Sequence, residues 1–171
     1  MSVFATGRRR LAFSLVELLV VIGIIGVMVG LLTAATMKVR AAAERTQCIS
    51  NLRQLGFAFQ SYRDTAEGRF PRAARLPSAA PELPSITKAL AGHVDGRHLF
   101  RCPSDATYFE REGVSYEYPG EFRGGLTLEQ LQAQGRGSDH IWLLYDFDCC
   151  HGPRGSGGSR NFLYADGHVS Q

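Results

Sequence analysis

A long, uninterrupted run of apolar residues lies near the start of the sequence. The 20 residues from Leu18 to Met37 carry no charged side chain, and about 20 apolar residues are enough for a helix to cross a bilayer. Three consecutive arginines, residues 8–10, precede the run, and Lys38 and Arg40 follow it. Because the N-terminal flank is very short, we expect its arginines to stay in the cytoplasm. The pattern predicts one membrane-spanning helix, with the remainder of the chain outside the cytoplasm.

After this run the helical pattern continues with only one apolar face. Its apolar residues recur at spacings of three, four or seven, which is typical of a single helical stripe. The stripe consists of Met37, Ala41, Cys48, Leu52, Leu55, Phe59, Tyr62 and Ala66. The opposite face carries Arg40, Glu44, Gln47, Asn51, Arg53 and Gln54. We expect one helix from Phe13 to Ala66, about 80 Å long, whose second half packs on the following chain.

The following chain consists of short elements. Prolines break up residues 68–98, where Ser85–Ala91 is predicted to form a short helix. Thr127 and Gln130 have the spacing of a helix capping box, and Asp166-Gly167 is a two-residue hairpin signal. The predicted strands are Leu99–Cys102, Val114–Tyr118, His140–Asp146 and Asn161–Ala165. The expected fold class is α+β, with a long N-terminal helix packed on a small antiparallel sheet.

The net charge and the absence of catalytic motifs argue against two classes of function, nucleic-acid binding and catalysis. The chain of 171 residues has a net charge of +3, but without residues 1–12 it has 16 basic and 16 acidic residues. The positive charge therefore belongs to a short leader and does not indicate nucleic-acid binding. We find no phosphate-binding loop, nucleophile elbow or paired acid/base motif in the sequence. We therefore expect no enzymatic activity.

Glu17 is the unusual residue of the apolar segment, with LAFSLV before it and LLVV after it. A carboxylate at membrane depth costs roughly 2.5–3.5 kcal/mol, so it indicates a function. Three simpler interpretations remain open: a side chain that reaches the headgroups, a plain membrane anchor, or a signal peptide. The apolar run is too long for a signal peptide, and neither it nor a plain anchor explains Glu17.

The segment GRRRLAFSLVELLVVIGIIGVMVGLL closely resembles the N-terminus of type IV prepilins and of the pseudopilins of type II secretion. In that family a prepilin peptidase removes the basic leader, the new N-terminal residue is N-methylated, and the fifth mature residue is a glutamate. The resemblance implies cleavage between Ala12 and Phe13, with Glu17 as the assembly glutamate. Ala12 departs from the family, which has a glycine before the cut.

The C-terminal half resembles a subset of these proteins that carries a C-terminal His and Asp-Gly motif. The matching segments are Cys48 with Asn51–Gly56, Phe100–Asp105, Ser115-Tyr116 and Asn161–Val169. His151 precedes Asp166 by fourteen intervening residues, more than the family has. The implied organisation is a leader (1–12), a transmembrane and assembly segment (13–37), an amphipathic helix (38–67) and an extracytoplasmic α+β domain (68–171).

This resemblance implies a pilin-like subunit of a type IV pilus or a type II secretion pseudopilus, which supports protein secretion. The implied partners are other pilin subunits, prepilin peptidase, an inner-membrane assembly platform and, indirectly, an assembly ATPase. The implied location is the inner membrane and then a filament. Two alternatives are a monomeric, single-span domain that binds a ligand or metal outside the cytoplasm, and a secreted protein that begins near Thr36.

Small residues and cysteines suggest further contacts. Gly23, Gly26 and Gly30 let apolar helices approach closely, although glycines are also common in membrane helices. Cys48 and Cys102 are candidates for a disulfide that ties the helix to the sheet; two buried thiols are the alternative. Cys149-Cys150 leaves open thiols, intermolecular bonds or a strained vicinal bond.

A metal site is a weaker hypothesis. Calcium would take the carboxylates of Asp146, Asp148 and Asp166. Zinc would prefer Cys150, His151 and His168. Neither spacing matches a strong motif, and the alternative is that Asp166 sits in its turn and that His151 and His168 are exposed. Apart from this calcium hypothesis we expect no cofactor.

Overall fold

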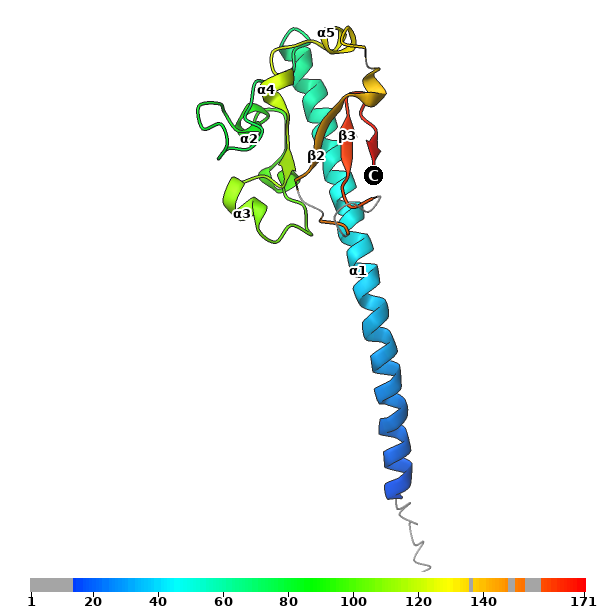
Figure 1. The fold of residues 1–171 in the computed structure, drawn as a ribbon. Helices are drawn as coiled ribbons and strands as arrows, with labels where there is room; N and C mark the ends of the chain where they lie inside the picture. Colours follow the sequence, from blue (N-terminus) through cyan, green and yellow to red (C-terminus); the bar gives the residue numbers. More distant parts are fainter. Residues whose placement is uncertain (1–13, 136, 148–149, 153–157) are drawn as a thin grey trace, which may run out of the picture. The chain divides into compact units, whose positions relative to one another are not determined.

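The computed structural model describes residues 14–135, 137–147, 150–152 and 158–171. It has one long helix, α1 (Leu15–Thr65), followed by short helices and a small sheet (Figure 1). The short helices are α2 (Ile86–Ala89), α3 (Tyr108–Glu112), α4 (Gly120–Arg123) and α5 (Leu128–Gln132), with 3-10 helices at Arg97–Phe100 and Ser138–His140. The strands are β1 (Tyr116–Glu117), β2 (Trp142–Asp146), β3 (Phe162–Tyr164) and β4 (Val169–Ser170). This is the expected α+β fold.

The chain divides into two compact units, Met1–Arg40 and Ala41–Gln171, and α1 contributes residues to both. In the first unit, the large apolar side chains from Leu15 to Val39 are 46–79% exposed. A helix that is apolar on all sides suits lipid or other apolar helices. By length and composition, α1 is able to cross a membrane.

The second unit contains an antiparallel sheet with the strand order β1-β2-β3-β4. Strands β3 and β4 form a hairpin in which Leu163 pairs with Val169. Gly167 in its turn has φ +92°, a conformation that side chains disfavour. The predicted hairpin is therefore confirmed, but its loop is longer than the predicted two residues. The Tyr164 amide donates to the His168 carbonyl oxygen, which leaves Ala165, Asp166 and Gly167 in the loop.

The core begins where the helical stripe reaches Cys48. Cys48, Leu52, Leu55 and Phe59 are at most 1% exposed, and Phe59 lies against the rings of Phe70 and Tyr118. Met37 and Ala41, which the stripe also included, are exposed. The core cluster contains no residue of α1 before Cys48, so the stripe is buried only from Cys48 onward.

Two local predictions are corrected. Leu99–Cys102 is not a strand: Arg97–Phe100 is a 3-10 turn, in which the consecutive residues Leu99 and Phe100 are both buried. Asn51, which the helical pattern predicts on the polar face, is only 3% exposed. Its Nδ2 donates to the carbonyl oxygen of Arg101 at 3.0 Å, and this hydrogen bond compensates for the burial of the amide.

The caps of two short helices follow the sequence. Thr127 accepts from the amide of Gln130, whose side chain accepts from the Thr127 amide, so the predicted capping box is confirmed at α5. Ser85 caps α2 by accepting from the amide of Lys88. These caps fix short helices that would be marginal alone.

Candidate functional site

The first candidate site is the start of α1. Ala12 and Phe13, the residues of the predicted cleavage site, lie outside the described residues. Glu17 lies in the first helical turn, where its Oε2 accepts a hydrogen bond from the Ser14 amide at 2.9 Å. A carboxylate here satisfies one open amide and interacts favourably with the helix dipole. Within a single chain, Glu17 therefore also acts as a helix cap.

The glycines of the same segment face open space. A Cβ added to Gly23, Gly26 or Gly30 would meet no described atom within 4 Å. The three residues are three and four positions apart, so they share one side of the helix. This side has room for another helix to approach closely.

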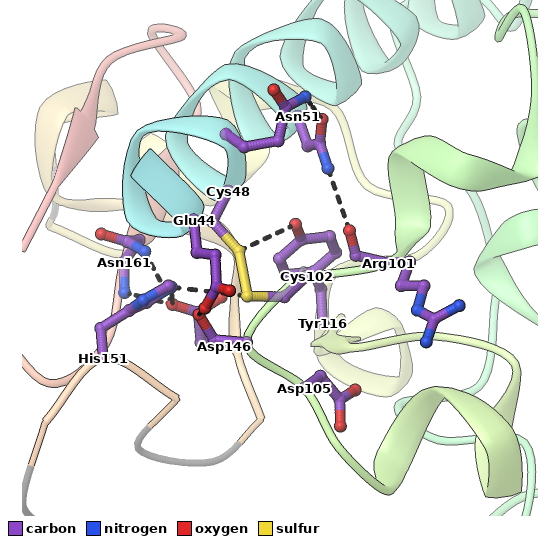
Figure 2. The surroundings of a disulfide bond; sticks show 12 residues. Glu44, Cys48, Asn51, Arg101, Cys102, Asp105, Tyr116, Asp146, His151 and Asn161 are labelled. Carbon is purple, nitrogen blue, oxygen red and sulfur yellow. Dashed lines mark hydrogen bonds and ion pairs between the residues drawn. A yellow bond between two sulfur atoms is a disulfide. The ribbon is translucent and has the colours of Figure 1, made fainter. Parts of the chain in front are cut away.

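The second candidate site surrounds a disulfide in the second unit (Figure 2). Cys48 of α1 is bonded to Cys102, with their Cα atoms 5.2 Å apart. Both residues are fully buried. Of the two alternatives for these cysteines, the structure therefore has the bonded pair. The Tyr116 hydroxyl donates to Cys48 Sγ at 3.5 Å, and burial raises the pKa of this tyrosine.

Asp146, His151 and Asn161 lie beside the disulfide (Figure 2). Asp146 ends β2, and antiparallel pairing brings Asn161, the residue immediately before β3, next to it. The amide and the Nδ2 of Asn161 donate to Asp146 Oδ2 at 2.8 and 2.9 Å. His151 Nε2 lies 3.4 Å from Cys102 Sγ and 3.5 Å from Asp146 Oδ2. This nitrogen therefore lies between a sulfur and a carboxylate.

Burial determines the charges of this group. Burial raises the pKa of Asp146 to about 6, against the hydrogen bonds from Asn161 and the positive charge of Arg45. Burial also lowers the pKa of His151; Arg45 adds to this effect and Glu44 opposes it. At pH 7 the imidazole is therefore neutral, so its contact with Asp146 is a polar contact rather than an ion pair. Asp146 Oδ1 is buried and has no hydrogen-bond partner among the described residues.

Together these contacts form a cluster of metal-ligating groups. Each of Cys48, Cys102, Asp146 and His151 offers one atom that could bind a metal, and these four atoms all lie within 4.8 Å of one another. A depression of about 650 Å³ reaches His151, and its lining includes Glu44, Arg45, Ser104 and Cys150. The sequence indicated the four members only separately: Cys48 and Cys102 as a disulfide, Asp146 as a calcium ligand and His151 as a zinc ligand. It did not group them, because they are far apart along the chain and have no motif spacing.

Of the calcium ligands proposed from the sequence, the two that the structure describes, Asp146 and Asp166, do not lie together. Asp146 lies where β2 ends and β3 begins, whereas Asp166 follows the other end of β3. Asp166 Oδ1 instead accepts from the His168 amide at 3.0 Å and contacts the His168 ring at 2.6 Å. Asp148 lies outside the described residues. His168, a member of the zinc alternative, lies in the hairpin turn with Asp166.

Comparisons with known proteins identify two segments. Residues 7–33 match the family model described as a prokaryotic N-terminal methylation motif. Residues 37–83 match the model of a protein family of unknown function, DUF1559. No curated protein and no solved structure matches the chain. The proposed C-terminal His and Asp-Gly motif lies outside both matched segments.

The methylation motif coincides with the apolar start of α1. The motif and the helix together indicate a single-pass, membrane-anchored protein. The N-terminal part of the chain is therefore similar to prepilin-type proteins: it carries a prokaryotic N-terminal methylation motif at residues 7–33, followed by a DUF1559 segment at residues 37–83.

Proposed function

We propose that the chain is a pilin-like structural subunit of a type IV pilus or of a type II secretion pseudopilus. The supporting observation is the methylation motif at residues 7–33, which overlaps a helix with exposed apolar side chains on all sides. Such a helix needs lipid before assembly and neighbouring helices after it. The role is structural rather than enzymatic.

Glu17 supplies the specificity of assembly in this proposal. Cleavage after Ala12 creates a positively charged amine at Phe13, at the edge of the apolar segment. An unpaired charge in a medium of low dielectric constant is far costlier than a paired one. The Glu17 carboxylate of a neighbouring subunit pairs with this amine, so any register that leaves the pair unmade is disfavoured.

The remaining assignments follow from this role. The leader stays in the cytoplasm, and the second compact unit lies outside it, where a disulfide between Cys48 and Cys102 persists. Prepilin peptidase removes the leader in the inner membrane. An assembly platform, driven indirectly by an ATPase, then adds the subunit to other pilins to support protein secretion.

Mass spectrometry of the mature N-terminus tests the proposal. The full chain is expressed with a C-terminal tag in a host that has prepilin peptidase, and is purified from membranes. We expect a chain that begins at a methylated Phe13. A matched preparation from a host without the peptidase should retain Met1. Recovery of an intact Met1 or of an N-terminus near Thr36 in the first host would contradict the proposal.

A further inference from the structure

The four ligating side chains around the disulfide are of the types that bind zinc. Thiolate, imidazole and carboxylate are the usual ligands of this ion, in a tetrahedron with bonds of about 2.0–2.3 Å. Ligand atoms at these distances stand roughly 3.3–3.8 Å apart. His151 Nε2 lies 3.4 Å from Cys102 Sγ and 3.5 Å from Asp146 Oδ2, which are separations of this size.

The surroundings of Asp146 point to a ligand independently of this spacing. Its Oδ1 is fully buried and has no hydrogen-bond partner among the described residues. A buried carboxylate oxygen without a partner is costly, and a cation held by both oxygens of this carboxylate would satisfy it. The other oxygen, Oδ2, is the one that lies 3.5 Å from His151 Nε2, and two hydrogen bonds from Asn161 hold it. Such bonds orient a ligand in metal sites.

The remaining groups suit a cation as well. The alternative without an ion predicts an exposed His151, but the His151 side chain is only 2% exposed, and in its neutral form it offers a lone pair to a metal. Tyr116 donates to Cys48 Sγ, a contact that also stabilises a thiolate. Two thiolates and one carboxylate carry three negative charges. A divalent cation neutralises two of them, and Arg45 is close enough to lower the pKa of Asp146.

We propose that the reduced chain binds one thiophilic divalent cation, of the Zn²⁺ class, through Cys48, Cys102, Asp146 and His151. Each cysteine loses its thiol proton when the metal binds. The disulfide excludes this ligand set, because its sulfur atoms are not thiolates. The cysteines are thiols when the chain is synthesised, so the metal-binding form precedes the disulfide-bonded form.

Cobalt binding by the full chain in detergent micelles tests the proposal. A water-soluble phosphine reduces the disulfide to two thiols and is itself oxidised to the phosphine oxide, with water as the oxygen source. After removal of the phosphine, Co²⁺ is added, and thiolate-to-cobalt absorption is recorded. We expect one Co²⁺ per reduced chain, released on addition of Zn²⁺, and no such absorption from the oxidised chain.

Variants identify the ligands. His151→Ala and Asp146→Asn should each weaken Co²⁺ binding by at least about tenfold. His168→Ala and Cys150→Ser should leave it unchanged. Circular dichroism of each oxidised variant reports whether it folds. If Asp146→Asn does not fold, the result with His151→Ala decides the test.

Three outcomes would overturn the proposal. The first is a reduced wild-type chain that shows no thiolate-to-cobalt absorption. This outcome counts against the proposal both when the reduced chain stays folded and when it unfolds even though Zn²⁺ is present. The second is full-strength binding by a folded His151→Ala variant. The third is loss of binding in Cys150→Ser, because the site would then use a different ligand set.

Discussion

Glu112 shows how a single buried charge is stabilised in this protein. Its side chain is 1% exposed and accepts hydrogen bonds from the Ser78 amide at 3.0 Å, Ser78 Oγ at 2.7 Å and Arg111 Nε at 3.0 Å. Burial alone would raise the pKa of this carboxyl, but the bonds from Ser78 and Arg111 outweigh burial and lower it. The ionised form is therefore favoured by folding.

We expect this carboxylate to make stability depend on pH. Because its pKa is lower in the folded chain, its contribution is complete above the ordinary value of 4.5 and is lost as pH falls through the lowered value. Ser78→Ala should cost about 1–3 kcal/mol at pH 7 and progressively less in acid. Denaturant unfolding of the wild-type chain and of this variant, at pH 7 and at an acidic pH below the lowered pKa, measures the cost. Exposed Glu110 is the control: Glu110→Gln should have little effect, and an equal cost of Ser78→Ala at all pH values would contradict the argument.

At the residue scale, the sequence predicts burial correctly where the helical periodicity of apolar residues determines it. Cys48, Leu52, Leu55 and Phe59 are buried as their spacing indicated. Asn51 was misplaced because its burial depends on a carbonyl oxygen fifty positions away, at Arg101. The contacts of His151 and Asp146 depend in the same way on chain pairing, which no local pattern encodes.

At the scale of elements, glycine at position 120 lets α4 approach the preceding chain. A Cβ there would lie 2.2 Å from the carbonyl oxygen of Ala73 and 2.4 Å from the Tyr118 ring. Since one of these atoms belongs to the backbone, the chain has to move. Gly120→Ala should therefore lower the free energy of unfolding by about 1–3 kcal/mol or more.

Gly92 provides the matched control for this substitution. It is exposed, and an added Cβ meets no described atom within 4 Å, so Gly92→Ala should change stability little. Urea unfolding of both variants measures the difference. Equal stabilities would show that α4 does not need the close approach.

Elements with local signals were predictable, and those without were not. The capping box of Thr127 and Gln130 and the hairpin at Asp166-Gly167 each depend on two residues no more than three positions apart. The 3-10 turn at Arg97–Phe100 has no such signal, because an apolar pair flanked by polar residues fits a strand equally well. Its conformation is selected by the core, which buries both Leu99 and Phe100.

At the scale of the whole molecule, the apolar part of α1 needs partners that the chain itself does not supply among its described residues. Its large apolar side chains from Leu15 to Val39 stay exposed, as their uniform apolarity predicted. Glu17 is the exception to that apolarity, and it has two separable properties. Its oxygen caps the first helical turn through the Ser14 amide, and in the proposed assembly its charge pairs with the amine of a neighbouring subunit.

Two substitutions separate these properties. Glu17→Gln keeps an oxygen that accepts from the Ser14 amide but removes the charge, whereas Glu17→Ala removes both. If the charge directs assembly, both variants should insert into the membrane, and neither should co-purify with a differently tagged wild-type chain. Glu67→Gln, at a residue whose side chain is 87% exposed in the second unit, should co-purify normally. Assembly of Glu17→Gln together with failure of Glu17→Ala would assign Glu17 to helix capping, since only the cap would then distinguish the two chains.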